Sequence, residues 1–323
     1  MSPDKKKRCV VLGGCGFLGS VISRHLVENG WKVRVFDQKG INTWRLETIL
    51  NEIELVTGDF LNTSDLANAV RDMPTVLHFI GTTIPQSSMS DIQFDIETNI
   101  AATVRLLDIV RGNEGQRIIF ASSGGTVYGM NHNQDPLLET DPTEPIVSYG
   151  VSKLTIEKFL QLFGHNFGVP YVILRIANPY GESQSVDQPQ GAVGVFLNRS
   201  VSGQKIEIWG DGSVVRDYIY ESDVASAVNA VLTTDKLSGI YNIGSGIGTS
   251  LNSLLDVIRE VTGLPCEVVY HGSRKFDVPS NILNIGKIRR DFGWSPGIGL
   301  SEGIRQMVSV LSQVEVQVTP TRP

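Results

Sequence analysis

The chain has 323 residues, of which 41% are hydrophobic and 19% charged, a composition typical of a globular protein with about two domains. Its formal net charge of −6 gives no electrostatic support for binding nucleic acid or a membrane surface. An anionic ligand would therefore have to be met by locally placed arginines.

The three cysteines, Cys9, Cys15 and Cys266, are odd in number and lack metal-ligand spacing. We therefore expect neither a disulfide framework nor a metal site, and a reducing compartment is favoured. The N-terminus is polar, and no apolar run reaches the length of a membrane span. These features together predict a cytoplasmic protein.

The first elements form a strand, a glycine-rich turn and a helix. An apolar run from Arg8 to Leu12 predicts a buried strand; Gly13, Gly16 and Gly19 follow in the pattern G-x-x-G-x-x-G, and a helical pattern then runs to residue 30. This arrangement points backbone N–H groups and a helix N-terminus at a pyrophosphate. The glycines alone also fit a tight turn that binds nothing.

A second strand, residues 32–36, ends in Asp37, about twenty residues beyond the glycines. A carboxylate there can accept both hydroxyls of an adenosine ribose and repels a 2′-phosphate, which favours NAD over NADP. Further strands at 53–57, 76–80, 117–121 and 171–176 alternate with helical segments. The alternation predicts a Rossmann-type, doubly wound parallel sheet.

Three later segments carry candidate chemistry. Residues 88–111 have apolar side chains at three-to-four spacing and predict one long amphipathic helix that contains Asn99. A turn rich in small residues, 122–126, follows a strand at the sheet edge where such folds bind ligands. Tyr149 and Lys153 are spaced i and i+4, so they share one face of a helix, and a lysine there favours the phenolate form of the tyrosine.

We place a boundary near residue 178, where the strand–helix rhythm loosens. Residues 1–177 are expected to form the dinucleotide-binding domain, and residues 178–323 mainly a smaller C-terminal lobe, with some of the chain returning to the sheet. The four tryptophans, Trp209 among them, are expected to be packing residues.

These motifs occur in an order that resembles the extended short-chain dehydrogenase/reductases of the nucleotide-sugar epimerase/dehydratase family. The resemblance covers residues 8–296 and rests on the glycine pattern, Asp37, Gly58-Asp59, Asn99, Y-x-x-x-K, Asn178-Pro179-Tyr180-Gly181 and Arg216-Asp217-Tyr218. It implies an N-terminal domain with tightly held NAD and a C-terminal lobe that binds a nucleoside-diphosphate sugar.

The resemblance also implies roles for individual residues. Tyr149 would be the base, and Lys153 would lower its pKa and bind the nicotinamide ribose. The cofactor would contact Gly13, Gly16, Phe17, Leu18, Gly19, Asp37, Asp59, Phe60, Phe79, Asn99, Ser122, Tyr149, Lys153 and Ile176. The substrate would contact Thr83, Asn178, Arg216, Arg274, Asp277 and Asn281. Two arginines suit a diphosphate in a net-negative protein.

The turn at 122–126 separates reaction types within the family. Its members usually carry Ser or Thr at the position of Gly124, so Ser123 and Thr126 are the hydroxyls that could replace it as catalytic residues. Sugar 4,6-dehydratases need an Asp-Glu pair at the positions of Gly125 and Thr126, and related uronate decarboxylases carry a glutamate at the latter. The chain has neither carboxylate, which leaves C4 epimerisation of a UDP-hexose through a 4-keto intermediate.

Several alternatives stay open. A 4-keto-sugar reductase, a dehydratase or a uronate-type epimerase would use the same fold, and a cofactor-sensing protein would typically lack the Tyr149–Lys153 pair. In the 4-epimerases that the chain resembles, the residue four beyond the position of Asp277 lies beside the 2-substituent of the sugar; here it is Asn281, and its small side chain implies that N-acetylated sugars are accepted as well as plain hexoses. Family members pair two long helices in a four-helix bundle, which implies a homodimer.

Overall fold

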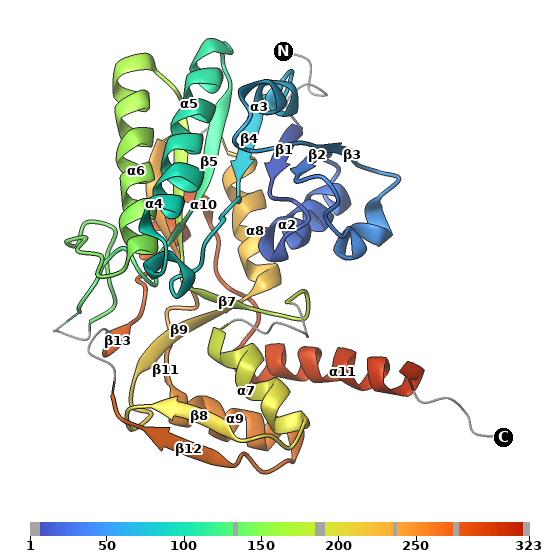
Figure 1. The fold of residues 1–323 in the computed structure, drawn as a ribbon, viewed down its shortest axis with the longest axis vertical. Coiled ribbons are helices and arrows are strands. Elements are labelled where there is room, and N and C mark those ends of the chain that lie inside the picture. Colours follow the sequence, from blue (N-terminus) through green and yellow to red (C-terminus); the bar gives the residue numbers. More distant parts are fainter. Residues whose placement is uncertain (1–6, 132–134, 185–190, 235–237, 274–277, 319–323) are drawn as a thin grey trace.

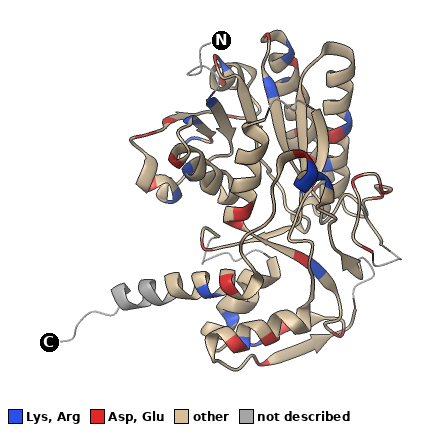
Figure 2. Ribbon diagram, turned by 180° about the vertical axis from the view of Figure 1, so that it is seen from behind, with Lys and Arg blue, Asp and Glu red and all other residues tan. Residues whose placement is uncertain are grey.

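The computed structural model describes residues 7–131, 135–184, 191–234, 238–273 and 278–318. The chain forms two lobes, a larger one around a central sheet and a smaller one below it in the view of Figure 1. Figure 2 shows acidic and basic positions interspersed over both lobes. Within the described residues, no helix is long and apolar enough to cross a bilayer.

The larger lobe is organised by a seven-stranded sheet in the order β10-β6-β5-β4-β1-β2-β3, in which the paired strands run parallel. The order reverses between β1 and β4, and ligands bind such sheets outside the carboxyl ends of the strands at that reversal. This confirms the predicted fold class. The strands are β1 (Arg8–Leu12), β2 (Lys32–Asp37), β3 (Glu54–Thr57), β4 (Thr75–His78), β5 (Arg117–Ser123), β6 (Tyr171–Ile176) and β10 (Ser238–Ile243).

The two faces of the sheet have separate hydrophobic cores because side chains alternate along each strand. In β1, Cys9 and Val11 pack with one core, while Val10 and Leu12 pack with the other. The first core is covered by α2 (Phe17–Glu28), α8 (Glu221–Leu232) and α10 (Gly286–Phe292), and the second by α3 (Thr63–Val70), α5 (Ala102–Gly112) and α6 (Ser148–Phe167).

The expected single helix over 88–111 is wrong in detail. The structure divides it into a 3₁₀ turn, η2 (Ser87–Met89), the short helix α4 (Ile92–Asp95), a π-helical segment, η3 (Ile96–Ala101), and α5. The spacing of apolar residues predicts a buried helix face, but it does not predict the hydrogen bonds of polar side chains within that face. Asn99, inside the π-helical segment, is buried and hydrogen-bonds to Thr82. Segments of this kind frequently mark functional sites.

The smaller lobe is assembled from segments on both sides of a return to the sheet. The chain leaves the sheet after β6, forms part of this lobe, returns through α8 and β10, and leaves again. Its core includes Phe196, Ile206 and Leu254. Its elements are β7 (Asn178–Tyr180), α7 (Gly191–Val201), β8 (Ile206–Trp209), β9 (Val215–Tyr220), β11 (Gly248–Ser250), α9 (Leu251–Thr262), β12 (Val268–His271), β13 (Ser280–Asn281) and α11 (Leu300–Val318), while η1 (Trp44–Ile49) packs beside α2 in the larger lobe.

Candidate active site

A cavity of about 680 Å³ lies at the carboxyl ends of β1, β2, β3 and β4. This is the edge at which the strand order reverses. Six of the predicted cofactor residues line it: Gly13, Gly16, Asp37, Asp59, Phe60 and Phe79. Phe17, Leu18 and Gly19 form the first turn of α2 directly behind Gly16.

The glycines of the loop are required by its backbone. Gly13 has φ +82°, which favours glycine, and a Cβ on Gly19 would lie 2.1 Å from the carbonyl oxygen of Gly13. Gly16 has an extended backbone at the start of α2 and no side chain, so it does not cap the first N–H groups of the helix. A loop without side chains and an uncapped helix N-terminus suit a pyrophosphate.

Asp37 joins the end of β2 to this loop. Its Oδ2 accepts a hydrogen bond from the backbone N–H of Cys15 at 2.9 Å, and its Oδ1 accepts one from the N–H of Gln38 at 2.9 Å. The carboxylate is therefore held in place at the cavity wall. A fixed acceptor at this place is compatible with the ribose contact expected of Asp37 from the sequence.

Tyr149 and Lys153 share one face of α6, as their spacing predicted. Lys153 is 8% exposed and donates from Nζ to the carbonyl oxygen of Ala121, at the end of β5, over 2.9 Å. The same Nζ lies 5.5 Å from the ring centroid of Tyr149. The backbone N–H of Tyr149 donates to Ser88 Oγ at 3.0 Å, which ties the start of the helix to η2.

The pKa of Tyr149 departs from our expectation. Burial, with the carboxylate of Asp95 as the second cause, raises the pKa of Tyr149 to about 12, whereas we expected Lys153 to lower it. Burial lowers the pKa of Lys153 to about 8, with Asp95 and Glu157 acting in the opposite direction. Residue spacing identifies the pair, but it does not report the burial of the phenol or a carboxylate from another helix.

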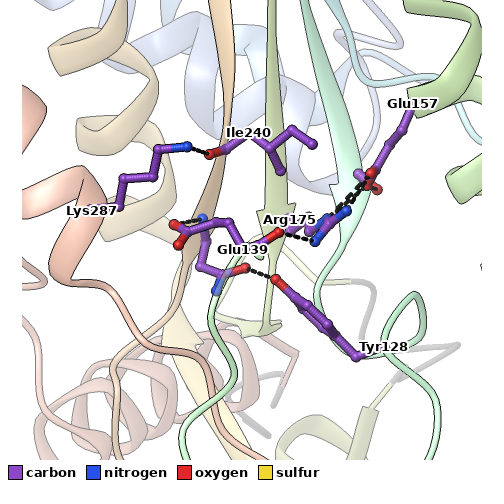
Figure 3. A network of polar contacts seen from close by, with 8 residues as sticks. Tyr128, Glu139, Glu157, Arg175, Ile240 and Lys287 are labelled. Atoms are coloured by element: carbon purple, nitrogen blue, oxygen red, sulfur yellow. Dashed lines mark hydrogen bonds and ion pairs between the residues drawn. The ribbon is translucent and has the colours of Figure 1, made fainter. Parts of the chain in front are cut away.

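A buried ion pair fixes α6 to the sheet one turn beyond Lys153. Arg175, on β6, donates from its second terminal nitrogen to Glu157 Oε2 at 2.7 Å, and both side chains are almost fully buried. Ser122 Oγ donates to Glu157 Oε1 at 2.5 Å, and Arg175 also lies over the ring of Tyr128. Figure 3 shows this network between the helix, the sheet and the segment around Glu139. The Ser122 hydroxyl thus serves the ion pair.

The turn at 122–126 lies between α6 and the smaller lobe. A Cβ on Gly124 would meet Leu283 Cδ1 at 2.5 Å, so Leu283 occupies the space that a Ser or Thr side chain would need. Asn281 donates from Nδ2 to the carbonyl oxygen of Gly124 at 3.0 Å. Thr126 Oγ1 is buried without a hydrogen-bond partner, and Ser123 is half-buried beside it. An unused buried hydroxyl is costly unless a ligand engages it, which keeps Thr126 a candidate.

A second cavity, of about 370 Å³, lies in the smaller lobe. Asn178 and Arg216 line it, as expected of substrate residues. Trp209, which we expected to be a packing residue, is 37% exposed and also lines it. Tyr218 contributes a buried hydroxyl with no hydrogen-bond partner. Aromatic walls with a guanidinium and free hydroxyl suit a nucleotide. The Tyr218 side chain was overlooked although its motif was noted.

The remaining predicted residues have mixed placements. Thr83 is buried and donates to Asp95, so its hydroxyl is already engaged. Ile176 is buried at the end of β6. Arg274 and Asp277 lie outside the described residues. Across the described part of the chain, no cluster of three or more His, Cys, Asp or Glu side chains could hold a metal ion.

Comparison with known proteins identifies the family. The family model of the NAD-dependent epimerases and dehydratases matches residues 9–244, which is most of the chain. This chain belongs to that family. The family assignment and the NAD cofactor expected from the sequence are thereby confirmed.

Three members of the family illustrate its range. The UDP-glucose 4-epimerase of Thermotoga maritima, solved with UDP-glucose, is 31% identical and superposes with a TM-score of 0.89 over 95% of this chain and 99% of its own. The UDP-glucose 4-epimerase of Thermus thermophilus, solved with NAD, is 31% identical, with a TM-score of 0.85 over 94% and 98%. The dTDP-4-dehydro-6-deoxyglucose reductase of Escherichia coli is 30% identical over 94% of this chain and 97% of its own.

Proposed function

We propose that this protein is an NAD-dependent UDP-hexose 4-epimerase. The observation that carries the proposal is the set of groups around the turn at 122–126, which we call the catalytic turn: Lys153 bonds to Ala121 just before it and lies beside the Tyr149 ring, and neither Gly125 nor Thr126 supplies a carboxylate. Elimination of water from a sugar needs an acid and a base at those positions. Removal and return of a hydride at C4 needs only one base beside the cofactor.

The residues of the chain would share this reaction as follows. Tyr149 takes the proton of the C4 hydroxyl and later returns it, and the positive charge of Lys153 stabilises the phenolate. Bound NAD supplies the hydride acceptor. Arg216 and Asn178 hold the diphosphate and nucleoside end in the second cavity. Because only that end is clamped, the keto-sugar can turn over and present its other face.

The substrate range is proposed from Asn281. This side chain is 1% exposed, contacts the catalytic turn through its Nδ2, and leaves its Oδ1 buried without a partner. A free buried acceptor can bind the N–H of an acetamido group. We therefore include both the plain UDP-hexoses and their N-acetylated forms.

Two further features belong to the proposal. Val151, Leu162 and Phe167 are apolar side chains on α6 that are between 45% and 50% exposed, which supports a homodimer through this helix and its neighbours. Light scattering of the parent and of Leu162→Glu tests the dimer: the variant should be monomeric, and a parent that is already monomeric contradicts the proposal.

The three cysteines are free and buried, which supports a reducing, cytoplasmic location.

A product assay tests the activity and distinguishes it from a 4-keto reductase. The purified protein is incubated with UDP-glucose, UDP-galactose and their N-acetylated counterparts, and products are followed by NMR. We expect C4 epimers with no added NADH. Turnover that depends on stoichiometric NADH would instead identify a reductase, like the Escherichia coli relative, and elimination products would identify a dehydratase.

A further inference from the structure

Asp95 is a fully buried carboxylate beside the Tyr149–Lys153 pair that no sequence motif pointed to. It ends α4 and has an exposed fraction of 0%. Within the described residues, its oxygens form no ion pair closer than 4 Å with a lysine or arginine. Four side-chain donors hold it instead. Leaving a buried charge to neutral donors is costly, so the arrangement calls for an explanation.

The four donors come from two parts of the larger lobe, the segments around Thr83 and Asn99 and the start of α6. Thr83 Oγ1 and Asn99 Nδ2 donate to Oδ1 at 2.5 and 2.9 Å. Ser148 Oγ and Ser152 Oγ donate to Oδ2 at 2.9 and 2.7 Å. Each oxygen therefore bonds to a different part of the molecule.

The two serines place Asp95 against the base. Ser148 directly precedes Tyr149 and begins α6, and Ser152 directly precedes Lys153. Asn99, on the other side, also bonds the side chain and backbone of Thr82, which lines the cofactor cavity. Asp95 thus connects the start of α6, through Ser148 and Ser152, to the segments beside the cofactor cavity, through Thr83 and Asn99.

Asp95 also acts by charge. It raises the pKa of Tyr149 and opposes the fall in the pKa of Lys153 that burial causes. Other titratable groups near the pair come from three elements: Glu157 on α6, Arg175 on β6, and His78 on β4, whose pKa burial lowers to about 3. Glu157 is neutralised by Arg175, and His78 is uncharged at neutral pH. The carboxylate of Asp95 is therefore the nearby charge without its own counter-ion among these groups.

We propose that Asp95 is a positioning residue for the Tyr149 base: it fixes the first turn of α6 against the cofactor cavity and supplies the negative charge that the Lys153 ammonium faces. The inference rests on the proposed function for its catalytic meaning. The effect of the Asp95 charge on the ionisation of Tyr149 can be measured in the protein without any assay of activity.

The direct test is Asp95→Asn, which keeps the shape and removes the charge. Without the anion the phenolate is less disfavoured, so Tyr149 should ionise at a pH lower by on the order of one unit. Tyrosinate absorbance is titrated in the parent and in Asp95→Asn, each against the same protein carrying Tyr149→Phe, so that the difference reports Tyr149 alone. If epimerase activity is present, the acidic limb of kcat/KM should move in the same direction.

Two further variants complete the design. Asp91→Asn removes an exposed carboxylate that caps the same helix by accepting from the N–H of Phe94, and it should leave the titration of Tyr149 unchanged. Ser148→Ala with Ser152→Ala keeps the charge but removes two of the four bonds, so kcat should fall without a shift of the acidic limb. A folded Asp95→Asn in which Tyr149 titrates as in the parent overturns the proposal. Should Asp95→Asn fail to fold, an unchanged kcat in the double serine variant overturns it.

Discussion

The two cavities are built from different kinds of sequence: the larger, at the carboxyl ends of β1–β4, is the proposed cofactor half of the site, and the smaller, in the second lobe, is its proposed substrate half. The cofactor half has at its centre a local motif: Gly13, Gly16, Gly19 and Asp37 lie within a single strand–helix–strand unit, and the segments after β3 and β4 complete the cavity wall. The substrate half comes from distant segments that strand pairing brings together, with Asn178 opposite Tyr218 and Asn281 opposite Arg216. A local motif therefore determines a backbone shape, whereas the placement of distant side chains depends on the whole fold.

The largest expected effect comes from the proposed base. Tyr149→Phe keeps the ring and removes the ionisable oxygen, so kcat should fall by about 10²–10⁴-fold while bound NAD and Tm stay close to the parent. Product formation by NMR and mass spectrometry of the extracted cofactor measure the two quantities. Near-normal turnover would contradict the assignment of the base and with it the proposed mechanism.

NAD binding in the cofactor half should be weakened by a single added methyl group. In Gly19→Ala the new Cβ must displace the carbonyl oxygen of Gly13, a backbone atom 2.1 Å away. Overpacking of this kind costs about 1–3 kcal/mol, so NAD binding should weaken by up to roughly 100-fold. Gly112→Ala is the matched control, since its Cβ meets nothing within 4 Å. Equal NAD occupancy in the two variants would show that the loop tolerates the change.

The substrate half should respond through binding of the nucleotide sugar. Arg216→Ala removes a charge-assisted contact worth about 1.5–3 kcal/mol, so KM should rise roughly 10–100-fold with less change in kcat. Arg216→Lys should recover part of the loss, because it keeps the charge without the planar fork. Arg259→Ala, on the exposed face of α9, controls for loss of surface charge. A fall in kcat alone would place Arg216 at the chemistry rather than at the diphosphate.

The smallest expected effect concerns discrimination between substrates. Asn281→Tyr should lower the rate with N-acetylated substrates relative to plain hexoses by roughly ten-fold, because the ring fills the space beside Gly124. Since Asn281 is buried, its Tm must be checked, and Asn281→Ser provides a smaller change that should keep both activities. If Asn281→Tyr folds and treats both substrates as the parent does, this residue does not set the range.

The fold could be predicted from the sequence, and six of the residues expected at the cofactor do line one cavity, for physical reasons. Strand β1 and the loop after it can be recognised because an apolar run specifies a buried strand and glycines mark a tight turn, and both are local features of the backbone. The substrate half was recognised only in part: Asn178 and Arg216 line the cavity, but Trp209 was expected in a core. Asp95 was missed because its bonding to Ser148 and Ser152 spans more than fifty residues. Burial of the phenol, with this long-range carboxylate as the second cause, raises the pKa of Tyr149, opposite to the direction expected from the sequence.

The return of the chain to the sheet has a consequence for biosynthesis. Strand β6 is complete at Ile176, but its partner β10 begins at Ser238, roughly 60 residues later, and α8, which covers one face of the sheet, lies between them. At the usual ~5–20 residues per second, the ribosome needs on the order of 3–12 s to supply that segment. During this interval β6 presents an unpaired edge and part of an apolar face. The nascent chain is therefore exposed to aggregation in the interval between the completion of β6 and the arrival of β10, the last strand of the central sheet.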